Sequence, residues 1–94
     1  MSAFVVESGT PFNITATGLA GGAKAGQLIG FYVNSTTAGT VILRSGGSGG
    51  AVLNGVITPA IGFHRFPANY AEGGLHVTVG GTLDVTFFVI PGVG

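Results

Sequence analysis

The sequence contains no cysteine and very few charges, and both absences restrict what the protein can be. Without cysteine, neither a disulfide nor a cysteine-ligated zinc ion can reinforce the fold. Only 6% of the 94 residues are Asp, Glu, Lys or Arg, and the formal net charge is zero, whereas about 25% is typical of soluble domains. A surface with so little charge favours self-association. Because hydrophobic residues reach 46%, we expect other subunits to cover part of it; a neutral surface of Ser, Thr, Asn and Gly is the alternative.

The same scarcity excludes several partners. The chain has no basic cluster, so we expect no binding to nucleic acid through phosphates. No uninterrupted apolar run approaches the roughly 18 residues of a membrane-spanning helix, so we expect no membrane partner. The start, MSAFVVESGTP, lacks the basic region and apolar core of a secretory signal, which predicts synthesis in the cytoplasm.

What the sequence does contain is strand signal. Apolar residues alternate with a period of two, and 19 glycines and four prolines punctuate the chain. In Thr82–Ile90, Leu83, Val85, Phe87 and Val89 fall on one face. Gln27–Asn34 is apolar on both faces, which predicts a central strand. The other predicted strands are Ala3–Val6, Phe12–Thr17, Thr40–Arg44, Ala51–Ile57, Ile61–Phe66 and Leu75–Val79.

Turn signals separate these strands, among them NSTTAG at 34–39 and VGG at 79–81. Short strands with turns every 8–12 residues are typical of antiparallel sandwiches and barrels. The sequence therefore predicts one all-β domain over residues 1–94, a jelly-roll-like antiparallel sandwich of about eight short strands. An immunoglobulin-like sandwich is the alternative.

The glycine-rich stretch SGGSGG at 45–50 resembles a linker or a phosphate-binding loop, but neither fits. A dinucleotide fingerprint needs a third glycine where Val52 stands, followed by a helix, and a Walker loop needs a lysine that is missing after residue 24. Gly46–Gly50 also matches the letters G-x-S-x-G, yet a strand is expected next, whereas a nucleophile elbow requires a helix. We predict a hairpin tip.

No arrangement of residues predicts catalysis or a resident metal. The acids are Glu7, Glu72 and Asp84, each near a turn or on an outward face, so no carboxylate pair is evident. His64 and His76 are expected to point outward from strands, although a metal at a symmetry axis is the alternative. We therefore predict no enzyme activity and no cofactor.

One resemblance covers residues 32–89. The stretches YVNSTTAGTVILR and ITPAIGFHRFPANYAEGGLHVTVGGTLDVTFFV resemble small β-rich proteins encoded among tailed-bacteriophage structural genes. Proteins of this kind are virion components, and some decorate or cement the head by binding the outer capsid as trimers or dimers. The resemblance implies a capsid decoration protein that stabilises the head by bridging major capsid protein subunits, with a trimer favoured. A tail- or baseplate-associated, glycan-binding module is the alternative.

The predicted contact residues lie at the two ends of the chain and on exposed aromatic positions. The apolar segment Ala3–Val6 could add to a neighbouring sheet, and the apolar C-terminus FFVIPGVG is unlike a free end. Edge strands of the same domain are the alternative reading of both ends. Tyr32, Tyr70 and Phe88 could stack on sugars, but a core or interface role is favoured. The predicted interface residues are Phe4, Val5, Val6, Tyr32, Phe88, Ile90, Pro91 and Val93.

Overall fold

The computed structural model describes residues 9–91, which form six β-strands and no helix. The strands are β1 (Thr10–Ile14), β2 (Gly18–Ala20), β3 (Gly26–Ser45), β4 (Ala51–Val52), β5 (Gly62–Tyr70) and β6 (Leu75–Pro91). Within this range, no helix is long and apolar enough to cross a membrane.

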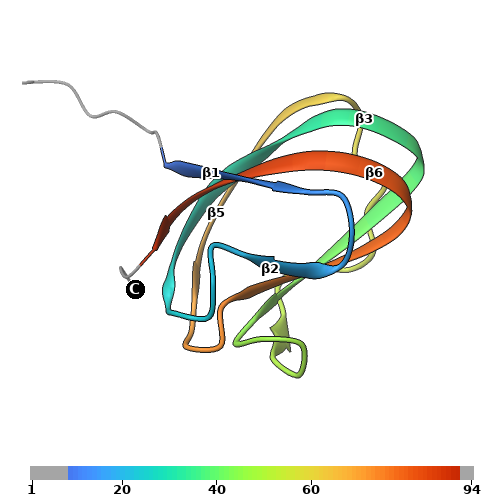
Figure 1. The fold of residues 1–94 in the computed structure, drawn as a ribbon. Helices are drawn as coiled ribbons and strands as arrows, with labels where there is room; N and C mark the ends of the chain where they lie inside the picture. Colours follow the sequence, from blue (N-terminus) through green and yellow to red (C-terminus); the bar gives the residue numbers. More distant parts are fainter. Residues whose placement is uncertain (1–8, 92–94) are drawn as a thin grey trace, which may run out of the picture.

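Two long strands form the centre of a single antiparallel sheet. β3 and β6 pair from Gly26 opposite Pro91 to Ser45 opposite Leu75, and they curve side by side through a wide bend (Figure 1). The bend divides the sheet into a first half, around residues 26–33 of β3, and a second half, around residues 40–45.

The short strands pair with the outer edges of this central pair. β1 and β2 lie one after the other along β6. β5 pairs with the first half of β3, and β4 pairs with its end. Each half is therefore four segments wide, and within residues 9–91 the sheet stays open between its two edges.

The bend explains why fewer strands form than the sequence predicts. The turns predicted at 34–39 and 79–81 are bends inside β3 and β6, where pairing continues across register shifts after Val33 and after Thr37. Ala38 adopts φ 55° and Gly81 φ 64°, left-handed conformations that turn the backbone without ending the ladder. Four predicted strands consequently merge into two.

The expected all-β, antiparallel architecture is confirmed, but the described residues form one open sheet of six strands instead of about eight short ones. β2 forms where a turn was predicted. The predicted strand at Ala3–Val6 lies outside the described residues.

The two halves bury their concave faces against each other in one hydrophobic cluster. Leu83, Val85, Phe87 and Val89 are buried as their alternation predicts. The remaining buried members come from both halves: Ala20, Leu28, Phe31, Val33, Val41, Leu43, Tyr70, Leu75 and Val77. Burial of these side chains is the main force that holds the two halves of the bent sheet against each other.

Tyr70 carries the one polar group in this cluster that lacks a partner. Its side chain is 2% exposed, and its hydroxyl has no hydrogen-bond partner within residues 9–91. Burial raises the pKa of this hydroxyl, because the interior disfavours the phenolate. Tyr70 is therefore a core residue and is not available to stack on a sugar.

The segment at 45–50 is a hairpin tip, as predicted. Ser45 pairs with Ala51 and Arg44 with Val52 on either side of it. The tip is also tied to the β5–β6 turn, because the backbone N–H groups of Gly46 and Gly47 both donate to the carbonyl of Gly74 at 3.0 Å.

After β4 the chain follows β3 without forming the long strand predicted at Ala51–Ile57. The side chain of Asn54 takes the place of a paired peptide group: its Oδ1 accepts from Leu43 N at 3.0 Å and its Nδ2 donates to Val41 O at 3.3 Å. Backbone pairing resumes at Ile57, which bridges to Val41.

Candidate interaction surfaces

The outer side of the first half of the sheet, here called the convex face, presents side chains in regular rows across four strands. In one row Tyr32 pairs with both Phe63 and Thr86, and Thr86 pairs with Asn13. In the next, Gly30 pairs with Arg65 and Phe88. Alternation places these residues opposite the buried positions of the same strands.

Aromatic rings gather around Gly30 on the convex face. The rings of Phe63 and Phe88 lie with their centroids 6.2 Å apart, and a Cβ attached to Gly30 would be 2.9 Å from the Cζ atom of Phe63. Phe63 is 51% exposed and Tyr32, beside it, is 43% exposed. The face therefore leaves much of its aromatic surface open to solvent.

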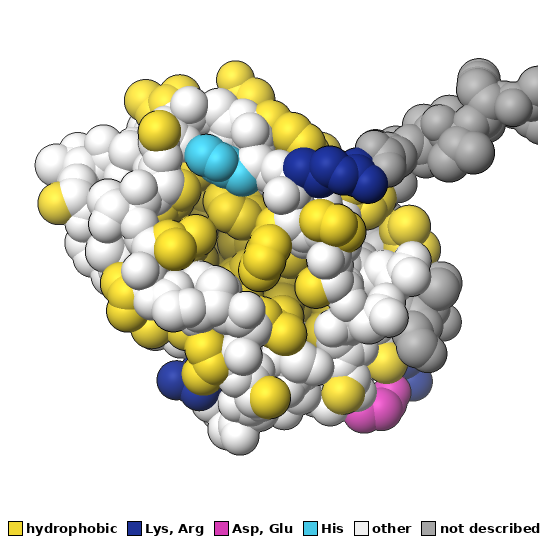
Figure 2. Space-filling model, turned by 180° about the vertical axis from the view of Figure 1, so that it is seen from behind, with side chains coloured by type: hydrophobic (Ala, Val, Ile, Leu, Met, Phe, Trp, Pro, Cys, Tyr) yellow, Lys and Arg dark blue, Asp and Glu magenta, His cyan; other side chains and the backbone are white. Residues whose placement is uncertain are grey.

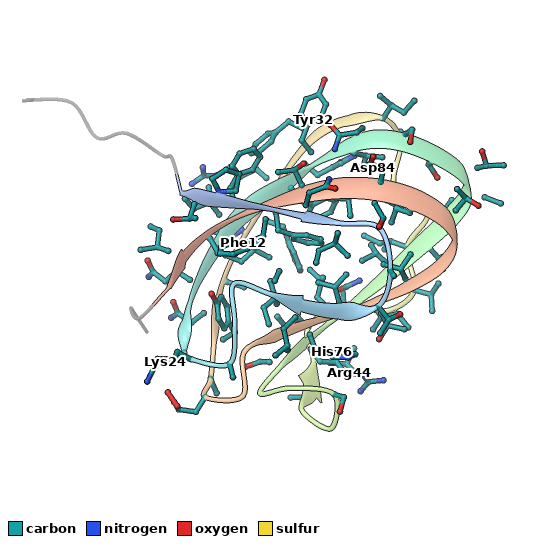
Figure 3. The ribbon with its side chains drawn as sticks, viewed as in Figure 1. Phe12, Lys24, Tyr32, Arg44, His76 and Asp84 are labelled. Carbon is teal, nitrogen blue, oxygen red and sulfur yellow. The ribbon has the colours of Figure 1, made fainter. Side chains whose placement is uncertain are left out.

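Beside the rings lies a hydrogen-bonded cluster, here called the Asp84 network, made of Asn13, Asn34, Asp84 and Thr86. Asp84 Oδ1 accepts from Asn13 Nδ2 at 2.7 Å and from Asn34 Nδ2 at 3.1 Å. Both amides also donate to Thr86 Oγ1, at 3.3 and 3.0 Å. Tyr32 and Asp84 lie on the same outer side of β3 and β6 (Figure 3). Three strands thus fix one carboxylate.

A second surface surrounds the opening between the edges of the sheet. Figure 2 shows hydrophobic side chains around a hollow on the side where β5 and the segment after β4 run. Three aliphatic residues of the segment after β4, here called the aliphatic rim, are exposed: Val56 by 65%, Ile57 by 37% and Ile61 by 64%.

The aliphatic rim lies in a stretch of sequence without charged residues. The sequence carries no Asp, Glu, Lys or Arg between Arg44 and Arg65. Clustered exposed aliphatic residues in an uncharged segment are characteristic of a surface that another molecule covers.

The two histidines lie in different halves of the sheet. His76 points outward between the buried Leu75 and Val77, as expected, with Thr78 Oγ1 3.5 Å from its Nδ1. The expectation that His64 points outward is wrong. Its ring lies 5.2 Å from that of the buried Phe31, and its Nε2 is 2.7 Å from the carbonyl oxygen of Ala60. Within residues 9–91, no group of three His, Cys, Asp or Glu side chains lies close enough together to hold a metal ion.

The predicted interface residues separate into two groups. Tyr32, Phe88 and Ile90 all lie on the convex face. Pro91 pairs through its backbone with Gly26, and its side chain lies outside the described part. Phe4, Val5, Val6 and Val93 lie outside the described residues altogether. The interface role of all eight residues stays a prediction.

Sequence reasoning missed Phe63 and the aliphatic rim. Phe63 was placed in a strand, and only its pairing with Tyr32 shows that it belongs beside the other rings. The uncharged stretch from residue 45 to 64 is the signal that could have identified the rim, because interface cores are depleted in charged residues.

Comparisons of this chain with protein-family models, with curated proteins and with solved structures find no match.

Proposed function

We propose that this protein is a structural subunit of a tailed-bacteriophage virion, most specifically a decoration or cement protein. It assembles as a homo-oligomer, with a trimer favoured, and binds major capsid protein on the outer surface of the head after synthesis in the host cytoplasm. The observation that carries the proposal is the aliphatic rim, because a free monomer would leave it in water.

Charge and size support the same proposal. A standard interface buries about 800 Å² on each partner, roughly one sixth of the 4845 Å² that the chain exposes. A surface without charge can meet another apolar surface without the desolvation cost of carboxylates or ammonium groups. With only six charges in the sequence, little electrostatic repulsion opposes the packing of several copies.

The aliphatic rim suits subunit contacts better than the convex face does. Burying the convex face would remove Asp84 from water, and its hydrogen-bond partners within residues 9–91 are neutral amides. A buried carboxylate without a cation is costly. Covering the aliphatic rim imposes no such cost.

The mechanism of stabilisation is mechanical. Each copy that bridges two capsid subunits adds its binding free energy to the work needed to separate them. Because many copies act on one particle, modest contacts sum to a large effect. We propose further that the two halves of the bent sheet form the two layers of a jelly-roll-like sandwich. The single core cluster shared by both halves supports this.

Quantitative mass spectrometry of purified particles tests the assignment. Hundreds of copies per particle are expected for a decoration protein, and tens or fewer would favour the tail or baseplate instead. Particles that lack the protein should lose heat or osmotic resistance, and adding the purified protein back should restore it. Absence of the protein from particles would rule out a virion role, and unchanged resistance would remove the cement mechanism.

A further inference from the structure

The convex face combines exposed aromatic rings with hydrogen-bond acceptors that are already fixed in place. We propose that it binds a neutral oligosaccharide: the apolar face of one sugar ring stacks on Tyr32 and Phe63, while sugar hydroxyls donate hydrogen bonds to the Asp84 network. This binding activity goes beyond the structural role proposed above and does not depend on it, because the aliphatic rim lies on other segments of the chain.

The rings supply the stacking surface. Tyr32 and Phe63 are cross-strand neighbours and are 43% and 51% exposed. Aromatic faces carry negative charge density and attract the weakly positive C–H groups on the flat side of a sugar ring. Gly30 keeps the position beside them free of a side chain, so the Phe63 ring rests close to the backbone of β3.

The Asp84 network supplies the acceptors. Both amide nitrogens are occupied inside the network, because they donate to Asp84 Oδ1 and Thr86 Oγ1. These bonds fix the carboxylate and the two amides while leaving Asp84 Oδ2 and the amide oxygens without partners within residues 9–91. A site fixed before binding loses little conformational entropy on binding.

The rings and the acceptors are close enough to contact one ligand. Thr86 is the cross-strand neighbour of Tyr32 and accepts a hydrogen bond from Asn34 at 3.0 Å. Neighbouring strands lie about 4.8 Å apart, so the acceptors begin one strand away from the ring. A single sugar ring and its hydroxyls span that separation.

Charge selects the class of sugar. Asp84 carries the only charge of the network, and a carboxylate repels sialic acid, sulfate and phosphate groups. Arg65 lies on the far side of the aromatic row, next to Gly30. Neutral hexoses and N-acetylhexosamines therefore fit the acceptors, whereas anionic glycans would have to avoid them.

A glycan array tests the proposal on the full-length protein. The array carries neutral, sialylated and sulfated oligosaccharides, and the protein is labelled at Lys24, its only lysine, in the loop before β3. Wild-type protein should bind neutral oligosaccharides. In a dilution series, Tyr32→Ala and Asn34→Ala should each weaken binding at least tenfold. Ile61→Ala, a control on the aliphatic rim, should bind as the wild type does.

Proton–nitrogen correlation spectra will show that each variant is folded before its binding is read. Failure to bind any neutral glycan, binding of anionic glycans alone, or binding by Tyr32→Ala and Asn34→Ala as strong as that of the wild type would each overturn the proposal. Loss of the oligomer in Tyr32→Ala without any glycan binding would also overturn it and would assign the convex face to subunit contacts. Glycan binding by a protein that is missing from phage heads would uphold the site and remove the decoration role.

Discussion

The ring of Phe63 covers Gly30, so that a Cβ on Gly30 would be 2.9 Å from Phe63 Cζ and 2.5 Å from the backbone carbonyl oxygen of His64. The second contact matters more, because backbone cannot rotate away as a side chain can. β5 therefore lies as close to β3 as it does only because residue 30 is glycine.

Gly30→Ala should consequently destabilise the fold by about 1–3 kcal/mol, the usual cost of overpacking. Urea denaturation gives the change in unfolding free energy. Gly49→Ala is the matched control, since a Cβ there would meet nothing within 4 Å. Equal stability of the two variants would contradict this prediction, because it would mean that β5 can move away from a Cβ at residue 30 without cost.

Asn54→Ala tests whether a side chain replaces the missing strand pairing. Removing the amide leaves Leu43 N without its acceptor in a partly buried position, and an unsatisfied backbone group costs about 1–3 kcal/mol. We expect a lower melting temperature and faster amide exchange at Leu43. Asn69→Ala, at an exposed position on β5, is the control and should behave as the wild type.

Tyr70→Phe should leave the protein at least as stable at neutral pH, because it removes a buried hydroxyl without a partner. Above pH 10 the unfolding free energies of Tyr70→Phe and of the wild type should diverge. Tyr70 ionises near pH 10 in the unfolded chain, whereas burial raises its pKa in the folded state. The unfolded state then binds fewer protons, so stability falls as pH rises. Urea unfolding between pH 7 and 11 should show a shallower alkaline loss for Tyr70→Phe than for Tyr32→Phe; identical slopes would contradict this account.

Two substitutions in the bend of the central strands should have different effects on stability. Gly81→Ala places a side chain at φ 64° and against the carbonyl oxygen of Ala38, so we expect a loss of about 1–2 kcal/mol from the conformation alone. Ala38→Gly relieves similar strain at φ 55° but makes the unfolded chain more flexible, so its net effect should be within about 0.5 kcal/mol. Calorimetry on both variants distinguishes them. A Gly81→Ala variant as stable as Ala38→Gly would mean that the bend does not require glycine.

Replacing Val56 and Ile61 together with serine should dissociate the proposed oligomer. Both side chains are more than 60% exposed in the single chain, so the change removes apolar contact area while costing the monomer little. Light scattering after size-exclusion chromatography would report the mass. A wild-type protein that is monomeric at high concentration, or a double variant that keeps its mass, would exclude the aliphatic rim as the subunit contact.

The sequence predicted which segments form strands, and which face of them is buried, better than it predicted where one strand ends and the next begins. Alternation identified the buried face of β6 correctly, because each inward residue is followed by a polar or half-exposed one. It could not distinguish a turn from a bend at residues 34–39 and 79–81, since glycine and left-handed residues serve both. Whether pairing continues through such a site depends on the partner strand, which local sequence does not reveal.

The candidate surfaces show the same limit. Tyr32 and Phe88 were identified as aromatic contact residues, but Phe63 and Asn13 join their face only through cross-strand register. Asn13 and Asp84 are 71 positions apart in the sequence. Such a network has no local motif, and only pairing of β1 with β6 brings it together.

The pairing of β3 with β6 also determines how the chain must fold. The nearest residues that pair, Ser45 and Leu75, are 30 positions apart, and the furthest, Gly26 and Pro91, are 65 apart. No tight turn can start this ladder, so a large loop has to close before its first hydrogen bond forms. Domains dominated by such distant contacts fold in milliseconds to seconds. During that interval β3 and β6 expose to solvent the apolar side chains that they later bury against each other.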